Sequence, residues 1–88
     1  MKFEYPENEK LIRHLETDCE LTDRAIRVCV RAAIANIRAL AKESEKAAGK
    51  MSEKSGKEML VKAVLFHERA NELQAYLDER RRDGHSDY

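Results

Sequence analysis

Two long segments decide the fold of this chain: TDRAIRVCVRAAIANIRALAKESEKAA at residues 22–48 and GKEMLVKAVLFHERANELQAYLDERRR at residues 56–82. In both segments apolar side chains recur every three or four residues, which is the period of an amphipathic α-helix. Residues 49–55 between them contain one glycine and two serines and fit a connection. The sequence therefore predicts a long antiparallel helical hairpin.

Two signals near the N-terminus set further helix boundaries. Pro6 suits the first position of a helix and predicts a short amphipathic helix over about 6–17. Thr22 supplies an N-cap, and Asp23 places a negative charge at the positive end of a helix dipole. We therefore expect the second helix over about 22–48.

The connection and the C-terminal end carry their own signals. Gly49 predicts the end of the second helix, because glycine readily adopts the left-handed conformation that follows a helix. Ser55 followed by Glu58 fits a capping box and predicts that the third helix runs over about 56–82. We expect residues 84–88 to form a frayed tail.

The composition favours one all-α domain over residues 1–88. Hydrophobic residues make up 42% and charged residues 39% of the chain, with one proline and no tryptophan. This balance is typical of a charged helical bundle rather than a disordered chain or a β-sandwich. A helical domain of this size buries a modest fraction of its surface, so stability often depends on oligomerisation or a partner.

Membrane proteins and secreted proteins are disfavoured by the sequence. No run approaches the roughly 20 apolar residues that a membrane-spanning helix needs. The first ten residues, MKFEYPENEK, lack the apolar segment of a secretory signal. We therefore expect a cytoplasmic protein in which Cys19 and Cys29 are reduced thiols.

The net charge of zero hides a partition of charge along the chain. Residues 1–23 carry three basic and seven acidic groups, residues 24–57 nine and three, and residues 58–88 five and seven. In an antiparallel hairpin the acidic segments can lie beside the basic one. We therefore expect the basic side chains of the second helix to be paired with acidic neighbours or solvated.

At 100° per residue, the side chains of the second helix fall into three groups. The first is a heptad-spaced row predicted to pack on the third helix: Ile26, Val30, Ala33, Ile37, Leu40, Ser44 and Ala47. The second is a row of mostly small side chains on the opposite side: Val28, Ala32, Ala35 and Ala39. The third is a continuous basic stripe: Arg24, Arg27, Arg31, Arg38 and Lys42.

The third helix shows a complementary apolar row. Its members, flanked by Leu60, Val64 and Tyr76, are Met59, Ala63, Phe66, Ala70, Leu73 and Leu77. Val61 and Leu65 lie on the far side among glutamates, where a monomeric hairpin would expose them. Together with the small row at Val28, Ala32, Ala35 and Ala39, they predict a homodimer that forms a larger helical bundle, with a three-helix monomer as the alternative.

Catalytic and metal-binding patterns are weak. His67 and Glu68 match the start of a zinc-binding HExxH motif, but Asn71 stands where the second histidine is required. His14 and Cys19 would have to meet other ligands from separate elements without close zinc-type spacing. We therefore predict no enzyme activity, no metal and no cofactor.

Three classes of function remain. The leading hypothesis is a small helical interaction or regulatory protein that binds or masks a site on a larger protein of unknown identity. The first alternative is nucleic-acid binding through the basic stripe, since a helical row of arginines can follow phosphates. The long helices and the seven-residue connection do not match a helix-turn-helix motif. The second alternative is a helical enzyme with an anionic-substrate site between subunits.

Overall fold

The computed structural model describes the backbone of residues 2–84 and the side chains of residues 2–81, and it is all-helical over this range. Its helices are α1 (Pro6–Arg13), α2 (Asp23–Ala48) and α3 (Glu53–Gly84), with a π-helical segment η1 (His14–Asp18) that continues α1. The predicted all-α class is therefore confirmed. No helix in this range combines the length and the apolarity needed to cross a membrane.

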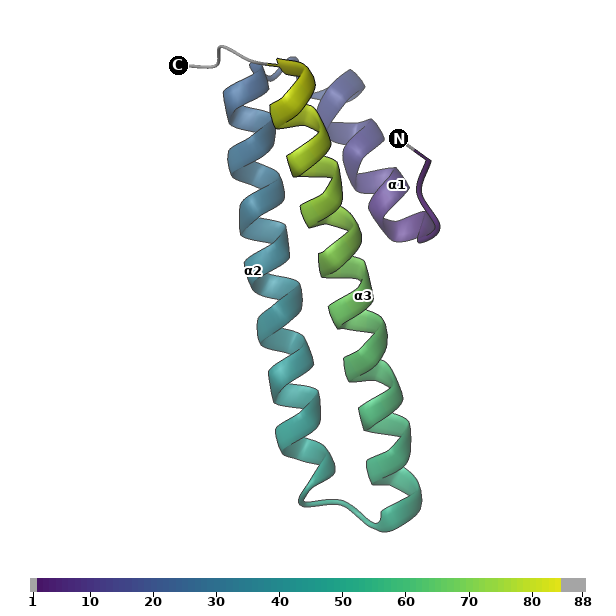
Figure 1. Ribbon diagram of the computed structural model, residues 1–88. Coiled ribbons are helices and arrows are strands. Elements are labelled where there is room, and N and C mark those ends of the chain that lie inside the picture. The colour runs from purple at the N-terminus through teal and green to yellow at the C-terminus, as the bar shows by residue number, and fades with distance from the viewer. Residues whose placement is uncertain (1, 85–88) are drawn as a thin grey trace.

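The molecule is an elongated hairpin with a short helix on one side of it. Figure 1 shows α2 and α3 side by side and antiparallel along their whole length, while α1 lies beside α3 near the chain termini. The principal extents are 49, 22 and 21 Å. We call the part containing α1, η1, residues 23–37 and residues 66–81 the terminal half, and residues 38–65 the turn half.

Large side chains form a core only in the terminal half. Ile12 and Leu15 of the N-terminal helical segment belong to the same buried cluster as residues of both long helices. The other buried members of this core are Ile26, Val30, Ile34, Ile37, Ala70, Leu73, Tyr76 and Leu77. Because burying such side chains is the main favourable term in folding, this cluster positions α1 on the hairpin.

The turn half is held together by small residues instead. The buried residues there are Ala41 and Ser44 of α2 and Gly56 and Ala63 of α3. A Cβ added to Gly56 would lie 2.9 Å from the carbonyl oxygen of Ala48. Glycine at this position therefore permits the close approach of the two backbones next to the turn, and its role is steric.

Two details predicted at the turn are wrong. α2 ends at Ala48 as predicted, but Gly49 has a right-handed conformation, with φ of −66°, instead of the left-handed one. The third helix begins at Glu53 rather than after Ser55: the Ser55 amide donates to the hydroxyl of Ser52 at 3.4 Å. The connection therefore spans only residues 49–52, which leaves the lengths of the helices as the argument against a helix-turn-helix motif.

The predicted N-cap of α2 is confirmed, and an unexpected turn precedes it. The Thr22 hydroxyl accepts a hydrogen bond from the Ala25 amide at 3.1 Å. Glu20 has a positive φ of 47°, which reverses the chain between η1 and α2.

The buried row of α2 differs from the predicted one at two places, one in each half of the hairpin. Ile34 and Ala41 are buried, whereas Leu40 is 47% exposed. A strict heptad row drifts around a straight α-helix of 3.6 residues per turn, so the contact line shifts by one residue, from Leu40 to Ala41. The predicted row of α3 is largely confirmed, although its flanking residues Leu60 and Val64 are exposed.

Candidate interaction surfaces

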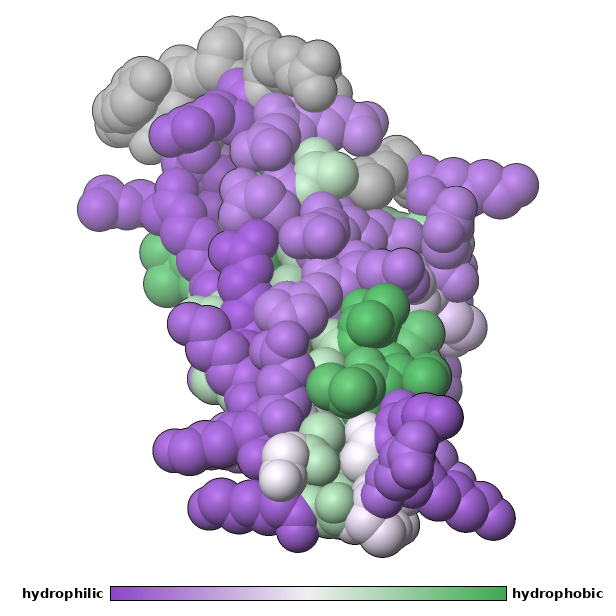
Figure 2. Space-filling view, turned by 60° about the horizontal axis from the view of Figure 1, so that its bottom comes forward, coloured by the Kyte–Doolittle hydropathy of each residue, from purple (hydrophilic) through white to green (hydrophobic). Residues whose placement is uncertain are grey.

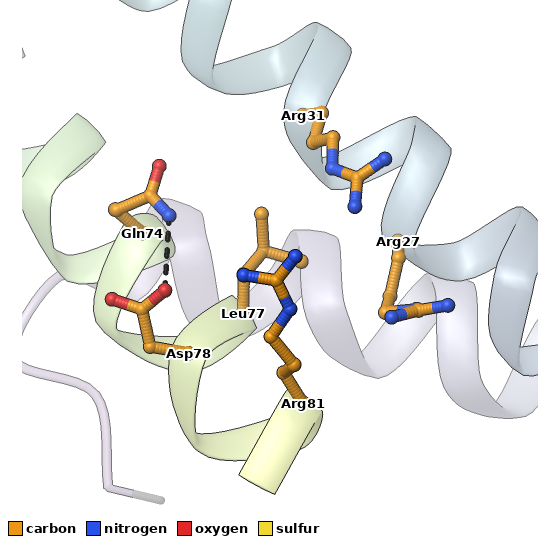
Figure 3. A pocket seen from close by; sticks show the side chains of 6 residues that line it. All are labelled: Arg27, Arg31, Gln74, Leu77, Asp78 and Arg81. Atoms are coloured by element: carbon orange, nitrogen blue, oxygen red, sulfur yellow. Dashed lines mark hydrogen bonds between the residues drawn. The ribbon is translucent and has the colours of Figure 1, made fainter. Parts of the chain in front are cut away.

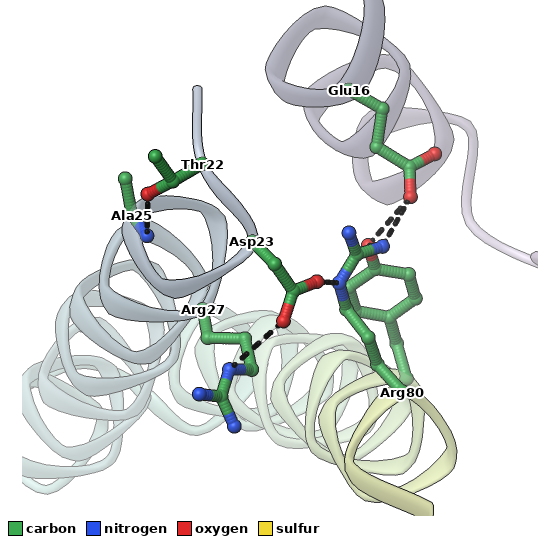
Figure 4. A network of polar contacts seen from close by, with 7 residues as sticks. Glu16, Thr22, Asp23, Ala25, Arg27 and Arg80 are labelled. Carbon is green, nitrogen blue, oxygen red and sulfur yellow. Dashed lines mark hydrogen bonds and ion pairs between the residues drawn. The ribbon is translucent and has the colours of Figure 1, made fainter. Parts of the chain in front are cut away.

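The basic stripe of α2 lies along one edge of the hairpin. Arg24, Arg31 and Lys42 are exposed, and Arg27 and Arg38 are half-buried. The Arg27 guanidinium contacts Asp23 one turn earlier, with an Nε to Oδ2 distance of 3.5 Å. This pair begins the network shown in Figure 4.

Most of the stripe is solvated rather than paired with acidic side chains of α3, which is one of the two outcomes expected from the charge partition. Across the hairpin, Asp23 pairs with Arg80, and Glu45 lies 3.5 Å from His67. In these two contacts, which lie within residues 2–81, the acidic side chain belongs to α2 and the basic one to α3. The stripe residues without an ion-pair partner among residues 2–81 are Arg24, Arg31, Arg38 and Lys42. Two acidic side chains of α3 contact the N-terminal segment instead: Glu68 binds Tyr5, and Glu72 binds Asn8.

A small pocket of about 110 Å³ lies at one end of this stripe. Figure 3 shows Arg31 and Arg27 of α2 facing Arg81 of α3 across it. Its other lining residues are Gln74, Leu77 and Asp78, and the Gln74 amide donates to Asp78 at 3.2 Å. Arg27 is paired with Asp23, but Arg31 and Arg81 against the single carboxylate of Asp78 still make this a locally positive site that favours anionic groups.

A polar network ties the start of α2 to α3 and η1. Arg80 of α3 donates to Asp23, and its Nη1 lies 2.8 Å both from Glu16 Oε2 and from the hydroxyl of Tyr76 (Figure 4). The Tyr76 hydroxyl donates to the same Glu16 oxygen at 2.7 Å. Arg80 therefore joins three segments of the chain, whereas the sequence showed it only as part of a basic run at the end of a helix.

The network perturbs the tyrosine that it contains. Burial and the hydrogen bond to Glu16 raise the pKa of Tyr76 from 10.0 to about 12, although Arg80 opposes this shift. Burial lowers the pKa of Arg80, but the hydrogen bond to Asp23 and the charges of Tyr76, Asp23 and Glu16 outweigh burial and raise that pKa. Both shifts favour the protonated hydroxyl and the charged guanidinium that donate the hydrogen bonds of this network.

A second set of polar contacts fixes the start of α1 to α3. Asn8 is fully buried, and its amide donates to the Arg69 carbonyl at 3.0 Å and to Glu72 at 2.9 Å. The Tyr5 hydroxyl donates to Glu68, which raises the pKa of Tyr5 to about 12. Sequence reasoning missed Asn8, because a polar residue in a short amphipathic helix gives no signal of burial.

The residues predicted to form a dimer face lie on two opposite surfaces. Val28, Ala32, Ala35 and Ala39 are all exposed on the side of α2 that faces away from α3. Val61 and Leu65 are exposed on the outer side of α3. The structure therefore does not bring the six residues together, and the body of the hairpin separates the two groups.

The larger apolar surface belongs to the turn half of α3. Figure 2, in which the turn end of the hairpin comes forward, shows a compact hydrophobic patch within a mostly hydrophilic surface. Exposed apolar residues that share the outer face of α3 are Leu60, Val61, Val64 and Leu65. Contiguous apolar surface of this kind marks interaction sites more often than isolated exposed residues do. Leu65 also borders a depression of about 440 Å³ between α3 and Tyr5 at the start of α1.

The polar residues considered for chemistry do not form a metal site in the described part of the chain. His14 meets Asp18 at 3.2 Å and Cys19 at 3.3 Å, because the π-helical segment brings them to one surface. No group of three or more potential ligands among the described residues is arranged to hold a metal ion. His67 of α3 contacts Glu45 of α2, away from that surface.

Comparisons with protein-family models, with curated proteins and with solved structures found no match for this chain. Two surfaces of the molecule are candidates for its function, namely the basic stripe of α2 and the apolar patch of α3.

Proposed function

We propose that this protein is a non-enzymatic helical interaction protein that works as a homodimer of hairpins and binds an acidic site on a larger protein. The basic stripe of α2 is the proposed binding surface. The observation that carries the proposal is that Arg24, Arg31, Arg38 and Lys42 have no ion-pair partner among residues 2–81. A row of charges with one sign favours a partner of the opposite sign and speeds its encounter.

Support for the dimer comes from the amount of apolar surface left on one hairpin. Four large apolar residues of α3 are between 45% and 60% exposed, and Leu40 and Met51 are similarly exposed in the turn half. Proteins of this size gain much of their stability from oligomerisation when a single core is small. Light scattering over a wide range of concentrations tests the dimer against the 10.2 kDa mass of one chain.

Affinity capture from the native cell extract tests the stripe. The immobilised wild-type protein should retain a protein partner, and the Arg31→Glu, Arg38→Glu double variant should lose it. The matched control is the Lys50→Glu, Lys54→Glu double variant, which makes the same change of net charge near the turn. Equal capture by all three proteins would contradict the role of the stripe.

Nucleic-acid binding is the second candidate, favoured by the pocket in which Arg27 and Arg31 face Arg81. If phosphates occupy this edge, affinity for a labelled oligonucleotide should fall linearly on a log–log plot against salt. Each phosphate-contacting charge that is removed should reduce the slope by about one. Capture that disappears after nuclease treatment, together with tight oligonucleotide binding at physiological salt, would favour this candidate over a protein partner.

A further inference from the structure

The outer face of α3 carries a second seam besides the one that is buried against α2. Lys57, Val61, Val64 and Glu68 follow one another at spacings of four, three and four residues, the pattern of positions a and d in a coiled coil. At 100° per residue these four side chains lie within about 60° of one another. Leu60 and Leu65 flank them, and Val61 is 60% exposed.

We propose that this outer seam is the interface between two copies of the chain, and that α3 packs antiparallel on α3 of the second copy. The inference rests on the proposed dimer and specifies its geometry. The two-fold axis lies between Lys62 and Ala63. In this register Val61 faces Val64 of the second copy, and Leu60 faces Leu65 of the second copy.

Charge complementarity selects this register. The axis that centres the apolar residues also places Lys57 opposite Glu68 of the second copy, and the symmetry repeats the pair at the other end of the interface. In a parallel arrangement each lysine would face a lysine and each glutamate a glutamate, which is unfavourable. The seam is therefore self-complementary only when the two helices are antiparallel.

The surroundings leave this face accessible. The buried row of α3, which includes Ala63, Ala70 and Leu73, points toward α2 and lies on the other side of the helix. Lys57 has a contact of 3.7 Å with Glu53, and both side chains are largely exposed, so exchanging this contact costs little.

One neighbour of the seam belongs to the segment before α1. The hydroxyl of Tyr5 donates to Glu68. A carboxylate can accept further hydrogen bonds, so Glu68 can bind Tyr5 and a lysine of the second copy together. The contact with Tyr5 is therefore compatible with the proposed interface.

The seam also explains why large apolar side chains are exposed in the turn half, whereas they are buried in the terminal half. Along residues 38–65 the hairpin has small buried side chains and no third helix. A second copy packed on α3 covers the apolar patch there. In this arrangement α3 lies between α2 of its own chain and α3 of the second copy.

Reciprocal charge reversal tests this geometry. Two copies of the Lys57→Glu variant should repel each other, because the new carboxylate at position 57 faces Glu68 of the second copy. The Glu68→Lys variant should repel itself through two facing ammonium groups. Each variant alone should dimerise about ten-fold more weakly than the wild type, because two exposed ion pairs become repulsive.

An equimolar mixture of the two variants should recover association. In the heterodimer one contact pairs the original lysine with the original glutamate, and the other pairs the two substituted side chains, so both contacts are attractive. Dimerisation should therefore return to the wild-type level, and sedimentation equilibrium measures the dissociation constants.

Two controls separate this effect from general changes in charge or folding. Lys46→Glu on α2 makes the same charge change outside the seam and should leave dimerisation unchanged. Tyr5→Phe removes the hydrogen bond to Glu68 without changing a charge and should do the same. Circular dichroism at equal concentrations checks that every variant remains helical.

The outcomes distinguish this interface from the dimer itself. A wild-type dimer whose mixed variants associate no better than each variant alone would overturn the α3 seam while leaving the proposed dimer in place. A wild-type mass of one chain at every concentration would overturn both. Recovery of association only in the mixture supports the antiparallel register.

Discussion

The terminal half and the turn half of the hairpin are built from the same two helices, but they differ in the size of the side chains that are buried between the helices. In the terminal half, α1 provides a third layer, and large side chains such as Leu73 and Val30 are fully buried. In the turn half, the buried positions of α2 and α3 hold Ala41 and Ala63, and the large side chains point outward. A helix pair alone has one interface, so large apolar residues on a second face of a helix need a further partner.

This difference predicts that the two halves of the hairpin differ in local stability. Burial of large side chains contributes most of the favourable free energy of folding, so the terminal half should resist local opening more strongly. The turn half depends on backbone proximity at Gly56 and on whatever covers the outer face of α3.

The largest expected effect on stability is that of Leu73→Ala in the terminal half. The matched substitution in the turn half is Leu60→Ala, which should have a small effect. Leu73→Ala should lower the free energy of unfolding by roughly 2–5 kcal/mol, because a fully buried side chain leaves a cavity. Leu60→Ala should cost less than about 1 kcal/mol under conditions where the protein is monomeric, since Leu60 is 47% exposed. Urea unfolding at low protein concentration measures both, and equal losses would contradict the contrast between the halves.

Two glycine substitutions next to the turn should change the stability of the protein in opposite directions. Gly56→Ala should destabilise the protein by about 1–3 kcal/mol, because the new Cβ would lie 2.9 Å from a backbone oxygen that cannot easily move. Gly49→Ala should stabilise it by about 0.4–1 kcal/mol, since φ is −66° and a Cβ there would meet its nearest neighbour at 3.6 Å. Thermal melting followed by circular dichroism gives both signs, and stabilisation by Gly56→Ala would show that the backbones are not in close contact.

The smallest expected effect concerns the polar network of the terminal half. Tyr76→Phe should cost about 1 kcal/mol at neutral pH, because the hydroxyl donates to Glu16 and accepts from Arg80. The pKa of Tyr76 rises from its ordinary value of 10.0 to about 12 in the fold, so its contribution is complete below pH 10 and is lost as the pH rises toward 12. The variant should therefore lose less stability than the wild type between these two pH values, as urea unfolding at a series of pH values measures.

Tyr5→Phe is the control for that measurement. The pKa of Tyr5 is also raised to about 12, but this exposed side chain belongs to the separate contact with Glu68. If Tyr76→Phe leaves the loss of stability at high pH unchanged while Tyr5→Phe reduces it, the assignment to the Arg80 network is wrong.

The candidate surfaces were predictable to different extents. The basic stripe follows from the period of α2, because its residues share one face whatever packs on the other. That the stripe lacks ion-pair partners could not be predicted from the period of α2, because it depends on Glu68 and Glu72 turning toward the N-terminal segment. The apolar patch was predicted in part through Val61 and Leu65, but Leu60 and Val64 were expected to flank the core.

The sequence by itself determined the all-helical class, the two long helices and the cap at Thr22, because periodicity, composition and capping are local properties of the chain. Only the tertiary structure decided that Leu40 is exposed while Ala41 is buried, and that Arg80 joins α3 to Glu16 and Asp23. Those features depend on the rotation and separation of packed helices. A shift of one residue along a helix turns a side chain by about 100°, which is enough to move it from the core to the surface.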